Sequence, residues 1–154
     1  MIDDRFETGQ ITSRIGISAT ASLFDNNNDL ITLIKDDDQS KPLNCILIDE
    51  AQFLTKEQVF DLSDVVDKLH IPVLAFGIRT DFQGELFEGS KALLAWSDKL
   101  IELKTVCYCG SKATMVIRPN AQGIPVKEGA QVEIGGNDRY LSVCRKHFKE
   151  AVRD

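Results

Sequence analysis

The middle of the chain carries the clearest pattern of apolar and polar positions. Residues 45–48 and 72–77 are short, nearly continuous apolar runs, typical of strands buried on both faces of a parallel sheet. Between them, Thr55 followed three residues later by Gln58 forms a capping box, which predicts the start of a helix. Apolar residues then recur at helical spacing, at Val59, Leu62, Val65, Val66 and Leu69. Strand, helix and strand in this order predict a right-handed βαβ unit.

Weaker patterns flank this unit. Residues 10–21 favour a strand with irregular ends, and residues 30–35 favour a short helix between acidic, amide-rich loops. After the unit we expect a helix over residues 90–96 and a strand over residues 99–104.

The pattern changes at Cys107. Short predicted strands at residues 114–118 and 131–134 are separated by a loop rich in proline and glycine, and a last helix is expected at residues 142–152. We therefore predict two domains, an α/β domain over residues 1–104 and a smaller domain over residues 105–154.

Composition and charge exclude several classes of protein. The chain has 154 residues, of which 43% are hydrophobic, so it can bury a real core. Its 18 basic and 24 acidic residues give a net charge of −6, which argues against a protein that binds nucleic acid or anionic membranes. The sequence contains no apolar run of the roughly 18 residues that a membrane span needs, and no signal peptide. We expect a soluble, cytoplasmic protein with no nucleic-acid or membrane partner.

Two adjacent acids, Asp49 and Glu50, follow the first apolar run and precede Ala51 and Gln52. The carboxyl ends of parallel strands are where open α/β sheets bind ligands. There, one acid can hold Mg²⁺ while its neighbour orients or deprotonates a nucleophile, as phosphoryl transfer requires. The simpler alternative is that the two acids only end the strand and begin the loop.

The same string also suits the Walker B strand of a helicase or ATPase. Both interpretations need a glycine-rich phosphate loop of the form G-x-x-x-x-G-K-[ST]. None of the ten glycines in the sequence is followed by Lys and then Ser or Thr. The sequence therefore contains half of a nucleotide site.

Three of the four cysteines lie in the last third of the chain, close to a histidine. Cys107 and Cys109 are followed, after 34 intervening residues, by Cys144 and His147. Three thiolates and one imidazole are the ligands of a closed, tetrahedral, structural zinc site. The alternative is three unrelated thiols and a surface histidine. Cys45, inside the first predicted strand, is expected to be a small buried apolar residue instead.

Together these pieces resemble the type II thymidine kinases, the tetrameric cellular and bacterial class, over nearly the whole chain. The resemblance depends on three motifs in order, at residues 48–53, 77–85 and 134–140, the last followed closely by residues 142–147. The C-x-C spacing that begins at Cys107 also resembles the bacterial zinc site.

This resemblance implies a P-loop-type α/β fold, with a mostly parallel sheet flanked by helices, plus a small zinc-binding lasso domain. It implies phosphorylation of the 5′-hydroxyl of thymidine by ATP, with zinc structural and Mg²⁺ bound with ATP. Glu50 would be the general base, Asp49 would help hold Mg²⁺, and Asp49, Glu50, Ala51 and Gln52 together would face the nucleotide. A homotetramer and feedback inhibition by dTTP are also implied.

The resemblance further implies a set of residues that contact thymidine. Aromatic walls supply contact area for a flat base, and main-chain groups can bind its edge. The residues at matching positions are Phe53, Phe82, Phe87, Val116, Val132, Glu133, Ile134, Gly135 and Tyr140. Val132, Glu133, Ile134 and Gly135 would belong to the lasso loop of the family.

The sequence departs from the family because its first strand and phosphate loop are missing. Positioning of phosphates is most of phosphoryl-transfer catalysis, so we expect negligible kinase activity from this chain alone. We also expect exposed apolar sheet surface and a tendency to associate. The alternatives are a non-catalytic, zinc-stabilised nucleoside-binding or assembly module and a helicase or ATPase fragment.

Overall fold

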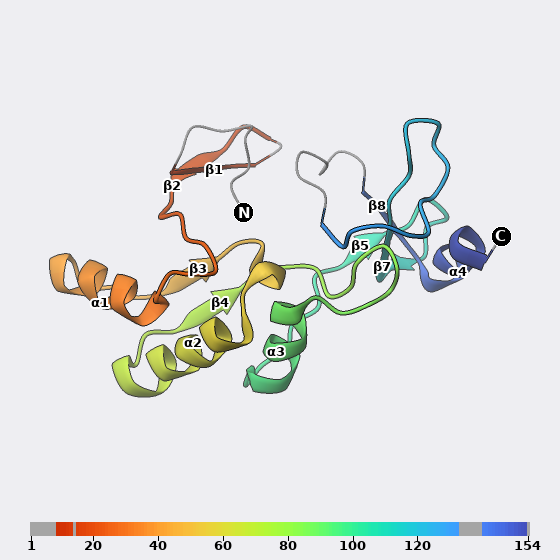
Figure 1. Cartoon of the computed structure of the whole chain (residues 1–154). Coiled ribbons are helices and arrows are strands. Elements are labelled where there is room, and N and C mark those ends of the chain that lie inside the picture. Colours follow the sequence, from red (N-terminus) through yellow and green to blue (C-terminus); the bar gives the residue numbers. More distant parts are fainter. Residues whose placement is uncertain (1–8, 14, 133–139, 154) are drawn as a thin grey trace.

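The computed structural model describes residues 9–13, 15–132 and 140–153, which form two lobes (Figure 1). The first lobe has its own buried core, built from Leu30, Ile48, Ala51, Leu54, Val59, Leu62 and Ala92. The second has a smaller one, built from Cys107, Ala113, Val143, Cys144 and Phe148. These cores lie on opposite sides of residue 104, and the domain boundary there stays a prediction.

The predicted βαβ unit is present in the first lobe. Strands β3 (Ile46–Ile48) and β4 (Val73–Ala75) pair in parallel, and helix α2 (Lys56–Leu69) connects them. The Thr55 hydroxyl accepts a hydrogen bond from the backbone N–H of Gln58, while the Gln58 side chain accepts one from the N–H of Thr55, so both halves of the capping box form. The unit ends at its carboxyl edge in the two predicted acids.

One face of this small sheet is exposed, so the prediction of strands buried on both faces is wrong. Ile46 and Ile48 pack toward the first core, but Leu47 is 68% exposed and its partner in register, Leu74, is 43% exposed. Alternation of side chains along a strand sends these two residues to the opposite face. Cys45 is exposed as well, which corrects the expectation that it is buried.

The elements before the βαβ unit differ from prediction in extent. Strands β1 (Gln10–Thr12) and β2 (Ser18–Thr20) form an antiparallel hairpin in place of one strand, with Gly16 in the left-handed region at its turn. Helix α1 (Leu30–Ser40) begins at the predicted residue but continues five residues further. Three of the added residues are aspartates, and the helix ends at Lys41, whose conformation is extended because Pro42 follows.

Helix α3 (Glu88–Trp96) and the short 3-10 helix η1 (Ala51–Phe53) complete the first lobe. The helix expected over residues 90–96 is confirmed. The strand expected over residues 99–104 is wrong, since these residues form neither helix nor strand and Leu100, Ile101 and Leu103 are exposed. Apolar residues at strand spacing form a strand only where a neighbour supplies the hydrogen-bond partners.

In the described part of the second lobe there are two antiparallel strand pairs and one helix. Strand β5 (Thr105–Val106) pairs with β6 (Lys112–Ala113), and β7 (Met115–Ile117) pairs with β8 (Leu141–Val143). Helix α4 (Arg145–Arg153) follows β8. The predicted strand at 131–134 is not seen at residues 131 and 132, and its remainder lies outside the described residues.

The fold is α/β, built from helices and small sheets. Among the described residues only β3 and β4 pair in parallel and the other strand pairs are antiparallel, so the expectation of a mostly parallel sheet stays a prediction. In the same part of the chain, no helix combines the length and the apolar character that a bilayer crossing demands.

Candidate active site and metal centre

The two predicted acids lie where β3 ends, and both are exposed. Glu50 adopts left-handed backbone dihedrals, with φ 51° and ψ 37°. A non-glycine residue held there is strained by about 1–3 kcal/mol, and such strain gathers at functional sites. The Asp49 carboxylate accepts a hydrogen bond from the backbone N–H of Glu50 at 2.9 Å, which orients the Asp49 side chain.

The buried Gln52 side chain is hydrogen-bonded to the Glu50 carboxylate. It is 3% exposed, and its Nε2 donates to Oε2 of Glu50 at 2.5 Å while its Oε1 accepts from the backbone N–H of Ile78 at 3.2 Å. A Cβ at Gly77 would lie 2.5 Å from this Oε1, so glycine there permits the contact. Gln52 therefore links the carboxylate to the chain that leaves β4.

Of the predicted aromatic residues, Phe53 follows these carboxylates closely in sequence and is half-buried, whereas Phe82 and Phe87 come after β4 and are buried. Phe53 in η1 and Phe87, directly before α3, form an edge-to-face pair with ring centroids 5.6 Å apart. Phe82 is 1% exposed, and the guanidinium of Arg118 lies over its ring at 3.7 Å from the centroid. The structure thus brings Phe53 and Phe87 together, and it joins Phe82 to the second lobe.

The other predicted nucleoside contacts belong to the second lobe. Val116 lies in β7, Tyr140 directly precedes β8, and Val132 follows the loop that leaves β7; all three are half-buried. Glu133, Ile134 and Gly135 lie outside the described residues. For these six residues a shared nucleoside site stays a prediction.

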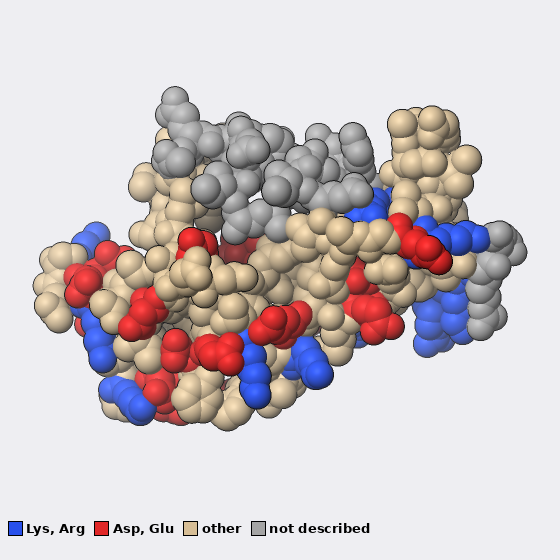
Figure 2. Space-filling view, in the orientation of Figure 1, with Lys and Arg blue, Asp and Glu red and all other residues tan. Residues whose placement is uncertain are grey.

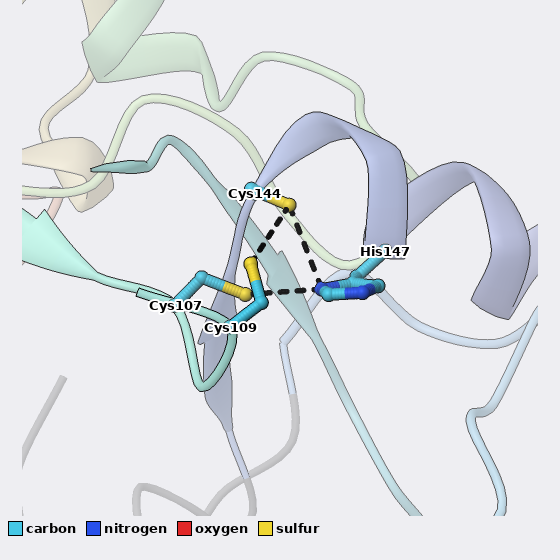
Figure 3. A group of neighbouring side chains, drawn as sticks. All are labelled: Cys107, Cys109, Cys144 and His147. Carbon is cyan, nitrogen blue, oxygen red and sulfur yellow. Dashed lines mark hydrogen bonds between the residues drawn. The ribbon is translucent and has the colours of Figure 1, made fainter. Parts of the chain in front are cut away.

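The four predicted zinc ligands converge (Figure 3). Cys107 and Cys109 come from the loop between β5 and β6, Cys144 follows β8, and His147 lies in α4. All four ligand atoms lie within 4.8 Å of one another.

The distances among these atoms match a tetrahedral metal site. The Sγ atoms of Cys109 and Cys144 are 3.9 Å apart, and Nδ1 of His147 is 3.3 Å from the sulfur of Cys107 and 3.6 Å from that of Cys144. Ligands about 2.0–2.3 Å from a zinc ion at tetrahedral angles are separated by roughly 3.5–3.8 Å. The residues therefore fit a zinc ion with all four positions filled by protein.

The surroundings favour thiolates at this site. Burial raises the pKa of the Cys107 thiol, but hydrogen bonds from the backbone N–H groups of Cys109 and Cys144 lower it by more. The net result is a pKa below the ordinary value of a thiol. Hydrogen bonds from the side chain and backbone of Ser111 lower the pKa of Cys109. Thiolate is the form that binds metal, so this environment prepares the site.

The ring of His147 is held on two sides. The Tyr108 ring stacks on it at 4.3 Å between centroids, and Nε2 lies 3.8 Å from a carboxylate oxygen of Glu150. These contacts leave Nδ1 directed at the sulfurs, as metal-binding histidines require.

Sequence reasoning missed three polar side chains between the lobes, of which Asp81 and Arg118 are buried and Gln131 is half-buried. Asp81 is 3% and Arg118 2% exposed, and Gln131 donates to the Asp81 carboxylate at 2.8 Å. The only sequence signal is that Arg118 ends an apolar run, which by itself indicates a strand end.

Charge is divided unequally between the two lobes. Residues 1–104 contain 10 basic and 19 acidic residues, and residues 105–154 contain 8 basic and 5 acidic ones. Figure 2 shows acidic side chains spread over the first lobe and basic ones gathered around α4. A shallow hollow of about 620 Å³ there is lined by Ser111, Lys112, Thr114, Cys144, Arg145, Lys146 and Lys149. It includes none of the predicted nucleoside contacts.

Comparison with known proteins identifies the family. Residues 1–148 match the thymidine kinase family. The chain is 64% identical over 151 residues to a thymidine kinase of Pasteurella multocida strain Pm70, covering 98% of this chain and 79% of the relative. It is 59% identical over 152 residues to that of Escherichia coli strain K12, covering 99% and 74%. Together with the carboxylates after β3 and the group of three cysteines and one histidine, these similarities show that the chain belongs to the thymidine kinase family.

Proposed function

We propose that this chain acts in the ATP-dependent phosphorylation of the 5′-hydroxyl of thymidine, giving dTMP, with Glu50 as the general base. The observation that carries the proposal is the fixed position of the Glu50 carboxylate at the carboxyl end of a parallel strand. Gln52 holds that carboxylate, and the backbone around it is strained. Such restraint suits a group that must meet a substrate atom in one orientation.

In this reaction Glu50 accepts the proton of the 5′-hydroxyl as the oxygen attacks the γ-phosphorus of ATP. The new O–P bond forms as the bond between the γ-phosphorus and the bridging oxygen breaks, and ADP leaves. Asp49, exposed beside Glu50, offers the carboxylate oxygen that Mg²⁺ prefers, and Mg²⁺ bound there with ATP neutralises phosphate charge. Ala51 and Gln52 complete the segment that we assign to the nucleotide.

We assign thymidine to the space between the aromatic residues of the first lobe and the segments flanking β7 and β8. Aromatic rings supply the apolar contact area, and backbone groups after Val132 supply hydrogen bonds to the base edge. The residues proposed for this role are Phe53, Phe82, Phe87, Val116, Val132, Glu133, Ile134, Gly135 and Tyr140.

Several finer properties are proposed from the family alone. They are a P-loop-type, mostly parallel sheet, a homotetramer, feedback inhibition by dTTP and a cytoplasmic location. Zinc is proposed as structural, because the four protein ligands leave no position for a substrate.

The decisive variant is Glu50→Gln, which keeps the size of the side chain but cannot accept the proton. Removal of a general base lowers rate by about 10²–10⁴-fold. Although we expect the activity of this chain alone to be very low, any phosphorylation of radiolabelled thymidine that it shows, captured on anion-exchange filters, should fall by this factor in the variant, while thymidine affinity changes little. Glu57→Gln, at an exposed carboxylate in the first turn of α2, is the matched control. A Glu50→Gln variant as fast as the control would refute the assignment of the base.

A second candidate is a zinc-stabilised module that binds thymidine without phosphorylating it. The observation in its favour is that none of the ten glycines begins the phosphate-loop motif. Thymidine binding without ATP binding, and without product in the same assay, would support this second candidate over the first.

A further inference from the structure

Two charged side chains are buried where the lobes meet and a half-buried amide lies beside them, and neither the proposed chemistry nor the zinc site uses these three groups. Asp81 comes from the loop after β4, Arg118 from the end of β7, and Gln131 from the segment before Val132. Burial of a carboxylate or a guanidinium is unfavourable unless hydrogen bonds satisfy it. The partners of these groups therefore indicate what they stabilise.

The Asp81 carboxylate joins two segments 50 residues apart. Its Oδ1 accepts the backbone N–H groups of Gln83 and Glu85, both at 2.9 Å, and these bonds close the turn that carries Phe82. Its Oδ2 accepts from Nε2 of Gln131 at 2.8 Å. One carboxylate thus fixes both the turn and the residue before Val132.

Arg118 makes a second connection between the same segments. Its guanidinium covers the Phe82 ring at 3.7 Å, and its Nη1 donates to the carbonyl oxygen of Ala130 at 2.9 Å. Gly129, with φ +138°, lets the backbone approach, because a Cβ there would lie 2.8 Å from Nη2. Arg118 therefore sets the distance between the Phe82 ring and the backbone before Val132.

Two further contacts connect the group formed by Asp81, Arg118 and Gln131 to the second lobe. Nε2 of Gln83 lies 3.4 Å from the carbonyl oxygen of Lys127. Arg118 directly follows Ile117, whose partner across the strand pair is Leu141, the residue after Tyr140. Segments leading to two proposed thymidine contacts, Val132 and Tyr140, thus begin at this cluster.

We infer that Asp81, Arg118 and Gln131 form a clamp that positions Val132 against Phe82, so that these three residues govern thymidine affinity without touching thymidine. The inference rests on the proposed function, which assigns Phe82 and Val132 to the nucleoside. A site whose walls are already fixed loses less conformational entropy when it binds, and so binds more tightly. The three residues are positioning residues.

The test exchanges the two partners of the 2.8 Å hydrogen bond in the full 154-residue, zinc-loaded chain. Gln131→Glu places a second carboxylate against Asp81 and breaks the clamp. The double variant Asp81→Asn/Gln131→Glu restores a hydrogen bond, since the new amide donates to the new carboxylate and its oxygen still accepts the turn N–H groups. Gln122→Glu introduces the same charge at an exposed position of the same lobe and is the matched control.

Two quantities are measured for each variant: the thymidine affinity, by isothermal titration calorimetry, and the rate of hydrogen–deuterium exchange in residues 126–132. We expect Gln131→Glu to weaken binding by about tenfold, the effect of roughly 1.4 kcal/mol, and to speed exchange in that segment. The double variant is expected to recover both values, and the control to leave both unchanged. Exchange in α2 should stay constant throughout.

The outcomes separate the clamp from the proposed function. A wild-type chain that binds no thymidine would refute the nucleoside assignment and the clamp with it. Wild-type binding that Gln131→Glu leaves intact, or a double variant as weak as the single one, would overturn the clamp alone. If Gln131→Glu loses the fold, Gln131→Leu removes the amide without adding charge. Full thymidine affinity in that variant would also overturn the clamp.

Discussion

At the scale of single residues, the candidate active site depends on one buried amide. The side-chain nitrogen of Gln52 donates to the Glu50 carboxylate and its oxygen accepts from the backbone N–H of Ile78, so both ends of the amide are hydrogen-bonded. The family resemblance implied that Gln52 faces the nucleotide. Its burial and both partners are tertiary facts that a single sequence does not contain.

Replacing Gln52 by leucine tests this arrangement. The variant leaves the Ile78 N–H without its acceptor and frees the Glu50 side chain, so we expect the free energy of unfolding to fall by about 1–3 kcal/mol. Urea denaturation measures the loss. Gln39→Leu, at an exposed position of α1, provides the baseline for the same chemical change. Equal losses in the two variants would mean that the Gln52 hydrogen bonds add nothing to stability.

At the scale of elements, local signals predicted structure well where the elements are self-sufficient. The capping box at Thr55 and the helical spacing after it correctly predicted the start and the apolar face of α2. The two flanking apolar runs correctly predicted the parallel pair of β3 and β4. The prediction failed for residues 99–104, where strand formation depends on a neighbour, and for Leu47, whose exposure depends on what covers the sheet. Neither neighbour nor cover is encoded in the local pattern.

The acidic surface between α1 and α2 gives a prediction of pH dependence. Burial, together with the nearby charges of Asp29, Asp64 and Glu57, raises the pKa of Asp61 above its ordinary value of 3.8. The folded state therefore binds this proton more tightly than the unfolded state, and the group lowers stability as pH rises through the raised pKa. At neutral pH the Asp61 charge is destabilising.

Asp61→Asn should accordingly raise the melting temperature at pH 7. The advantage should shrink as pH falls and disappear below about pH 3.8, where Asp61 is protonated in both states. Asp67→Asn, exposed on the same helix, should show neither effect. Thermal scans from pH 3 to pH 8 follow both variants, and a gain that stays constant over that range would contradict the electrostatic explanation.

At the scale of the whole molecule, the two lobes have unequal cores and unequal means of stabilisation. The second core contains five buried residues, two of them metal-ligand candidates. Structural zinc sites supply about 10–16 kcal/mol of apparent binding free energy, as much as the whole stability of a typical domain, about 5–15 kcal/mol. We therefore expect the second lobe, unlike the first, to depend on a bound metal for its stability. The sequence predicted the ligand set from residue types and spacing, but not the clamp that joins the lobes.

Removal of zinc should unfold the second lobe and spare the first. We expect about one zinc per chain by elemental analysis, in line with a single four-ligand site. After chelation, hydrogen exchange should become fast in β5–β8 and α4 while α2 stays protected. Cys144→Ser should lower the zinc content, whereas Cys45→Ser, at an exposed cysteine outside the ligand group, should not. A chelated chain that keeps full protection in β7 and β8 would show that the metal is not structural.

We propose that the two lobes together bind thymidine, and calorimetric titration of thymidine into the wild-type, zinc-loaded chain measures this binding. We predict saturable binding at one site per chain, weakened by chelation of zinc because six of the nine proposed contacts lie in residues 105–154. Absence of binding at millimolar thymidine, or binding that survives loss of the second lobe unchanged, would contradict it.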